Sequence, residues 1–217
     1  MINEKQLAEM IKEAKTTEKK KKFKQSLELI MVFKDIDVKK GFTLNETIQL
    51  PKTSSPAAIC VMASGDMGLK AKSAKADRVM DNDEINRLAS NKRASRKLIN
   101  SFDFFLADTK LMPVVGKVLG QLLGPRGKMP TPVPFNAPID SFLTRFRASV
   151  RVRVKNSLSM SCKIGDESMD DADLAANAHA VLSAVEKKLP NGDKNIRKVL
   201  IKTTMGKIAK EPQLVKK

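Results

Sequence analysis

The pattern of apolar residues changes twice along this chain, and these changes limit the folds that it can adopt. In SLELIMVFK (26–34) and NETIQL (45–50) apolar residues alternate with polar ones, which is typical of strands with one buried face. From AAICVMA (57–63) to FDFFLAD (102–108) the apolar runs are continuous, and helix-compatible segments separate them. Continuous runs that alternate with helices indicate a parallel sheet buried on both faces.

Alternation returns after the proline-rich stretch at residues 124–138. In SVRVRVKN (149–156) valines alternate with cationic side chains, which predicts a strand with one apolar and one cationic face. We expect SLSMSCKI (157–164) to be its hairpin partner and IRKVLIKTT (196–204) to be the last strand.

Helical spacing of apolar residues predicts helices before, between and after these strands. Asn3 is suited to cap the first helix, with the side chain of Gln6 reaching back to it as in a capping box. The helices are expected at residues 4–15, 67–75, 82–89, 91–100, 111–123, 139–146 and 170–188.

Segments of antiparallel type therefore flank a segment of parallel type. The simplest arrangement is one domain built from both chain ends, residues 1–56 plus 146–217, with residues 57–145 inserted as a second domain. The predicted fold class is α/β and α+β, as a split two-layer α+β domain with an inserted Rossmann-like three-layer α/β domain. The two crossings between the domains imply a hinge.

The charge of the chain indicates its class of partner. The 217 residues carry a formal net charge of +17. A folded chain this basic is typical of a protein that binds a polyanion, because phosphate contacts release counterions; charge that only keeps the protein in solution is the alternative. The chain has no Trp and no Tyr, so folded RNA is favoured over single strands that stack on aromatic side chains. No stretch reaches the ~20 apolar residues of a membrane span, so no membrane partner is expected.

The cysteine and histidine content argues against catalysis and metal binding. Cys60 and Cys162 are too far apart in sequence for a CxxC motif, and buried free thiols in a reducing cytoplasm are expected. His179 is the single histidine, and a position on a helix surface or in the core is expected for it. We therefore predict no catalytic residue, no metal ligand and no cofactor, and the chain is not expected to be an enzyme.

The segment GPRGKMP (124–130) superficially resembles a phosphate-binding loop. A Walker loop requires GxxxxGK followed by Ser or Thr, but Met129 follows Lys128 and the first glycine is misplaced. Arg126 and Lys128 either contact phosphates from a flexible backbone or belong to a helix cap and turn; the sequence leaves both interpretations open.

Two features of the split domain could contact RNA. The basic run Lys19 to Lys24 is interrupted by Phe23, so it is either a solvated charge run or a rim of phosphate contacts with Phe23 against a sugar or base. At the end of the last strand, Thr203, Thr204, Met205 and Gly206 combine small hydroxyls with a glycine. Such residues allow an RNA backbone to approach and can bond to 2′-hydroxyls.

A cationic sheet face is the third candidate. Arg151, Arg153 and Lys155 share one face of a strand, and Lys163 follows in the next strand. Like charges on one face of a sheet repel each other, so such a face favours an anionic partner. Lys198 and Lys202 of the last strand would enlarge this surface if that strand lies nearby.

Three segments together resemble a known family: KKFKQSLELIMVFKDIDVKK (21–40), LGPRGKMPTP (123–132) and VLIKTTMGK (199–207). They resemble the first ribosomal protein of the large subunit, the lateral stalk protein beside the tRNA exit site, in its archaeal form. The resemblance implies a cytoplasmic, ribosomal protein, monomeric when free, that binds large-subunit rRNA and takes part in the release of deacylated tRNA from the exit site. It also implies a repressor that binds its own mRNA.

The resemblance also implies which residues bind RNA. Lys198 stands where the family often has Ser, so we expect a phosphate contact there in place of a hydroxyl bond. Together with Thr203, which the strand-end pattern adds, the predicted RNA-binding residues are Lys22, Phe23, Glu28, Lys155, Lys163, Lys198, Thr203, Thr204, Met205 and Gly206.

Overall fold

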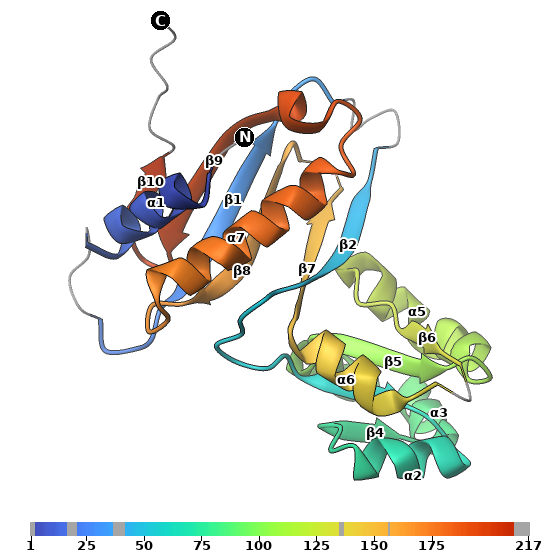
Figure 1. Cartoon of the computed structure of the whole chain (residues 1–217). Helices are drawn as coiled ribbons and strands as arrows, with labels where there is room; N and C mark the ends of the chain where they lie inside the picture. Colours follow the sequence, from blue (N-terminus) through green and yellow to red (C-terminus); the bar gives the residue numbers. More distant parts are fainter. Residues whose placement is uncertain (1–2, 17–20, 37–41, 135–136, 156, 211–217) are drawn as a thin grey trace, which may run out of the picture. The chain divides into compact units, whose positions relative to one another are not determined.

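The computed structural model describes residues 3–16, 21–36, 42–134, 137–155 and 157–210, and the chain divides into two compact units (Figure 1). The split unit is formed by Met1–Ser55 with Ala148–Lys217, and the inserted unit by Pro56–Arg147. The domain boundaries expected from the sequence differ from these limits by one or two residues. That each unit is an independently folding domain stays a prediction. None of the helices among the described residues is long and apolar enough to cross a membrane.

The split unit contains a four-stranded antiparallel sheet with the order β10-β9-β1-β8, and a separate ribbon of β2 and β7. Helices α1 and α7 lie side by side against one face of the sheet (Figure 1). The elements are α1 (Glu4–Thr16), β1 (Ser26–Phe33), β2 (Leu44–Gln49), β7 (Ser149–Val154), β8 (Ser159–Asp166), α7 (Asp171–Glu186), β9 (Ile196–Thr203) and β10 (Ile208–Lys210).

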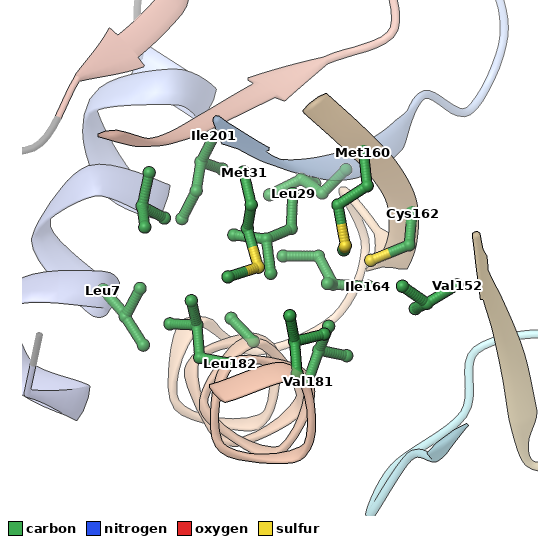
Figure 2. Packing of buried hydrophobic residues seen from close by; sticks show 14 of the residues in the cluster. Leu7, Leu29, Met31, Val152, Met160, Cys162, Ile164, Val181, Leu182 and Ile201 are labelled. Carbon is green, nitrogen blue, oxygen red and sulfur yellow. The ribbon is translucent and has the colours of Figure 1, made fainter. Parts of the chain in front are cut away.

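The alternation in β1 explains how this sheet holds its helices. Leu27, Leu29, Met31 and Phe33 are buried, and the residues between them are half-buried. Figure 2 shows Leu29 and Met31 on the sheet side of the core, facing Leu7 of α1 and Val181 and Leu182 of α7. The first helix begins as the sequence predicts, because the Asn3 N–H donates to Oε1 of Gln6 at 3.1 Å.

The expectation that residues 149–156 and 157–164 form a hairpin is wrong. β7 pairs with β2 and β8 pairs with β1, both antiparallel, in different sheets. The six residues of β7 pair along the full length of β2, and β8 pairs with seven residues of β1. Alternation fixes which face of a strand is buried, but it does not identify the neighbouring strand.

The inserted unit is a parallel four-stranded sheet with the order β4-β3-β5-β6. Because β3 and β5 are buried throughout, successive residues fill two separate cores, one on each face of the sheet. Helices α3, α4 and α5 cover one core, and α2 and α6 cover the other. The elements are β3 (Ile59–Met62), α2 (Gly65–Ser73), β4 (Arg78–Met80), α3 (Asn82–Ser90), α4 (Lys92–Ser101), β5 (Phe104–Asp108), α5 (Met112–Arg126), β6 (Thr131–Val133) and α6 (Ile139–Arg147).

Two short strands, β6 and β10, are absent from the sequence-based prediction. β6 contains Pro132 between two further prolines, and proline normally argues against a strand. It is tolerated here because β6 lies at the edge of the sheet, where one side of the backbone has no partner strand.

Candidate nucleic-acid interface

Several hydrogen bonds connect the 204–206 turn, which follows β9, to the start of β1. The Thr204 N–H donates to the carbonyl of Ser26 at 3.0 Å, and the Ser26 N–H donates to Oγ1 of Thr204 at 3.1 Å. The Met205 N–H donates to Oε1 of Gln25 at 3.1 Å, and the Gly206 N–H donates to the carbonyl of Thr203 at 3.2 Å. Two segments that are distant in sequence therefore form one rigid backbone feature.

The side chains of this feature differ in what they can present to a ligand. Met205 is 65% exposed and Phe23 is 52% exposed, which is high for large apolar side chains. The Thr204 hydroxyl already bonds to the backbone of Ser26. Thr203 is 1% exposed because the last residue of β9 faces the core. The expectation that Thr203 offers its hydroxyl to RNA therefore disagrees with its burial, and its contribution is to support the turn.

A row of alternating charges crosses three strands close to this turn. Glu28 of β1 stands opposite Lys202 on β9 and opposite Lys163 on β8. The Nζ of Lys202 lies 3.9 Å from Oε2 of Glu28. The Nζ of Lys163 lies 2.7 Å from Oδ1 of Asp166 and 3.2 Å from Oγ of Ser55. Lys163 is thus held in place by partners before any ligand binds.

The carboxylate of Asp166 is stabilised by this arrangement. Its partial burial alone would raise its pKa, but hydrogen bonds from Lys163 and Ser54 and the charges of Lys163 and Lys24 lower the pKa below its ordinary value. The ion pair with Lys163 therefore persists at neutral and mildly acidic pH. An anionic ligand that approaches Lys163 has to share the lysine with Asp166.

The open sheet face is the side of the four-stranded sheet that points away from α1 and α7. The expectation that Lys198 and Lys202 enlarge the cationic surface of Lys163 is met in part, because β9 lies beside β1 and all three lysines point to this face. Half-buried aliphatic side chains, such as Ile30, lie between them. The face is formed by Glu28, Ile30, Val32, Ser159, Ser161, Lys163, Lys198, Leu200 and Lys202.

The other predicted cations are elsewhere in the split unit. Arg151 and Arg153 lie on the β2–β7 ribbon opposite Thr47 and Asn45. Burial and then the charge of Arg153 lower the pKa of Arg151, which shows that the two guanidinium groups repel each other. Lys155 is exposed just beyond the end of β7.

The basic run before β1 is only partly described. Lys22 and Phe23 are exposed and precede β1 directly. Lys19 and Lys20 lie outside the described residues.

Gln25, which is absent from the residues predicted from the sequence, positions the turn by accepting a hydrogen bond from it. Gln25 is only 2% exposed; its Oε1 holds Met205, and its Nε2 lies 3.5 Å from Oε2 of Glu167. The sequence could have identified Gln25, because it is two residues before Leu27 and four before Leu29 and so continues the buried face of β1. A polar residue that continues the buried face of a strand requires a hydrogen-bonding partner.

The residues considered for metal binding, catalysis or phosphate binding make contacts within the protein. Among the described residues, no group of His, Cys, Asp and Glu has the arrangement of a metal site. Nδ1 of His179 lies 3.7 Å from Oε1 of Glu4, between two neighbouring surface helices. Nζ of Lys128 donates to the carbonyls of Ile99 and Phe102 at 3.1 and 2.6 Å. The Lys128 side chain therefore bonds to the end of α4. The helix-cap interpretation of this segment is confirmed at the end of α5, where Gly127 has a left-handed φ of 69° and its N–H donates to the carbonyl of Gly124 at 3.0 Å.

Comparison with known proteins gives a consistent result. The Ribosomal protein L1p/L10e family matches residues 11–207. "Large ribosomal subunit protein uL1" of Cenarchaeum symbiosum is 68% identical over 211 residues, covering 97% of this chain and 98% of the relative. Proteins of the same name from Thermofilum pendens and Methanothermobacter thermautotrophicus are 47% and 37% identical; each covers 94% of this chain, and the chain covers 92% and 98% of them.

Proposed function

The chain belongs to the Ribosomal protein L1p/L10e family, whose members are non-enzymatic constituents of the large ribosomal subunit, and we propose that it binds the RNA of that subunit through the split unit. The proposed interface consists of the 204–206 turn, the start of β1 with Lys22 and Phe23, and the open sheet face. As a ribosomal protein of this family, the chain functions in the cytoplasm on the ribosome.

The observation that carries the proposal is the combination of rigid backbone and exposed apolar side chains at the turn. Hydrogen bonds to Ser26 and Gln25 fix the turn, while the Met205 side chain remains 65% exposed. A fixed turn loses little conformational entropy when a ligand binds. Phe23 and Met205 can cover sugars or bases, and the nearby lysines can neutralise phosphates.

The details of recognition follow from this arrangement. Because the Thr204 hydroxyl already bonds to the backbone of Ser26, we propose that Thr204 orients the turn and that Met205 and Gly206 contact the RNA. Glu28 can accept hydrogen bonds from 2′-hydroxyls or base amino groups, and the pairing with Lys202 holds its carboxylate toward the open sheet face. Lys198 supplies a phosphate contact at the far end of the same face.

We extend the proposal to the place and the consequences of binding, on the resemblance to the lateral stalk protein. The bound RNA is the stalk region beside the tRNA exit site, and the protein there assists the release of deacylated tRNA. A similar fold in its own mRNA would occupy the same surface, so that excess free protein represses its own synthesis. Crosslinking in cell extract followed by sequencing of the attached RNA tests all three partners at once.

Matched substitutions test the interface itself. Met205→Asp replaces the exposed apolar side chain of the turn with a carboxylate, which the negatively charged RNA backbone repels, and it should weaken binding to large-subunit rRNA transcribed in vitro by about 1–3 kcal/mol. Leu69→Asp is the control, because Leu69 is equally exposed, at 63%, but lies in the inserted unit. Equal loss in the two variants would reject the proposed interface.

Salt dependence separates a phosphate-rich interface from an apolar one. With ~6–10 phosphate contacts, the affinity for rRNA should fall by orders of magnitude between about 50 and 200 mM salt. A flat dependence would exclude the lysines of the open sheet face as phosphate ligands.

A further inference from the structure

A groove of about 710 Å³ opens between α3, α4 and α5 of the inserted unit. It lies on the outer side of the helices that cover one face of the parallel sheet. Its walls combine aliphatic and cationic side chains, and it contains no aromatic or acidic residue. The proposed interface with rRNA uses only the split unit, so this groove has no part in it.

A second apolar stripe of α5 lines the groove. Along α5, Val115, Leu119 and Leu123 are buried in the core of the unit. Val114, Val118 and Leu122 form a second stripe that is half-buried, packed on the core from one side and lining the groove on the other. With a spacing of four residues, this second stripe extends for roughly 12 Å, or about two helical turns.

The wall of the groove is cationic. Lys92 and Arg96 are one turn apart on α4, and Lys117 is on α5; all three are exposed and line the groove. None of the three has an ion pair within the part of the chain that the structure describes. Other cations of this unit do have one, as in the contact of Arg147 with Asp77 at 4.0 Å.

We propose that the groove docks an amphipathic, acidic segment of a partner protein. Its aliphatic side chains, one helical turn apart, would pack on Val114, Val118 and Leu122, and its carboxylates would face Lys92, Arg96 and Lys117. This is the complement of the groove in both shape and charge, and it corresponds to the common mode in which an amphipathic helix lies in an apolar groove. The volume suffices for the side chains of such a segment.

Nucleic acid fits the groove less well than an acidic protein segment. An RNA duplex presents a phosphate-lined surface, which would contact the cations but leave the continuous aliphatic stripe on α5 open to water. Unpaired bases stack chiefly on aromatic rings; the groove has none, and Arg96 is the one guanidinium among its lining residues. An amphipathic acidic protein segment can cover the aliphatic stripe and pair with the cations at the same time.

A synthetic peptide tests the proposal on the full-length protein. The probe is a fluorescein-labelled helical peptide with leucines at i, i+4 and i+8 and glutamates on the flanking positions. A scrambled peptide of the same composition controls for the attraction of any acidic peptide to a basic protein. In fluorescence anisotropy we expect the probe to bind at least tenfold more tightly than the scrambled peptide, and equal affinity would overturn the proposal.

Charge reversal locates the site. Lys92→Glu with Arg96→Glu should weaken binding of the probe at least tenfold, and a peptide with lysines in place of the glutamates should then bind this variant. Lys70→Glu with Lys72→Glu is the control, because it changes the net charge equally at exposed positions of α2. Equal losses in the two double variants would overturn the proposal.

Two further measurements test the apolar stripe and the competing ligand. Val118→Asp, in protein whose thermal unfolding shows that it is folded, should also abolish binding of the probe; unchanged binding would overturn the proposal. A short RNA duplex should not displace the probe. Displacement by the duplex, lost on reversal of Lys92 and Arg96, would assign the groove to RNA instead. Because Met205→Asp leaves this groove intact, it should leave peptide binding unchanged even if it abolishes rRNA binding.

Discussion

Replacing Gln25 with leucine separates positioning of the 204–206 turn from direct contact with RNA. Gln25 is 2% exposed and cannot itself touch a ligand on the surface. Its Oε1 accepts the hydrogen bond of the Met205 N–H at 3.1 Å. Leucine has a similar volume and fills the same buried space, but it accepts no hydrogen bond. The substitution therefore releases Met205 without removing any atom from the proposed interface.

The size of the effect follows from the contacts. Loss of this one hydrogen bond, which is part-buried, should lower the free energy of unfolding by about 1 kcal/mol. On binding, however, the backbone of Met205 has to be fixed again, which costs about 1–2 kcal/mol for one residue. The Kd for rRNA should therefore rise about 5- to 30-fold.

Isothermal titration calorimetry with a large-subunit rRNA transcript, at one fixed salt concentration, measures the Kd. Urea unfolding measures the free energy of unfolding. Glu167→Gln is the control, because it changes only the long 3.5 Å contact of Gln25 Nε2 and leaves the acceptor of Met205 in place. If Gln25→Leu binds rRNA within twofold of the wild type, Gln25 does not position the turn. If Glu167→Gln weakens binding as much as Gln25→Leu, the effect comes from the charge at Glu167.

Three further predictions concern the scaffold. Asn177 is fully buried and bonds to three backbone groups between 2.7 and 3.0 Å away, so Asn177→Ala should lower the urea unfolding free energy by about 2–4 kcal/mol, and a change below 0.5 kcal/mol would contradict this assignment. Gly120 lies inside α5 with open space where a Cβ would stand, so Gly120→Ala should raise the same free energy by about 0.5–1 kcal/mol; a decrease would refute the reasoning. Burial raises the pKa of both Cys60 and Cys162 to about 12, so both thiols stay protonated at pH 8 and should react with thiol reagents only upon unfolding, whereas rapid labelling of the folded protein would show that a thiol is accessible.

The faces of the strands were predictable from the sequence, but the partners of the strands were not. Alternation correctly indicates that Leu27, Leu29 and Met31 are buried, because parity along a strand is a local property. Continuous apolar runs correctly indicate strands buried on both faces, as at β3 and β5. The pairing of β7 with β2 joins segments about a hundred residues apart in sequence, and no local pattern contains that information.

The sequence indicated where the candidate site lies, but not what each side chain does there. The strand-end pattern and the resemblance identify the 203–206 segment as a unit. They do not reveal that Thr203 faces the core or that the hydroxyl of Thr204 is already bonded to Ser26. Those properties depend on how the start of β1 lies against the end of β9, which is a tertiary contact between segments almost the whole chain apart. Gln25 shows how such a contact can be predicted: a polar residue that falls on the buried face of a strand requires a hydrogen-bonding partner there.

The position of β1 in its sheet imposes an order of events during synthesis. β1 emerges early from the ribosome that makes the chain, but its two neighbours in the sheet, β8 and β9, follow only after the whole inserted unit. The backbone of β1 therefore waits unpaired while the inserted unit, whose strands are contiguous in sequence, can already close its sheet. The turn at 204–206 and the start of β1 meet last. A nascent or truncated chain that ends before β9 lacks the 204–206 turn, Lys198 and Lys202, so the proposed interface is complete only in chains translated almost to their end.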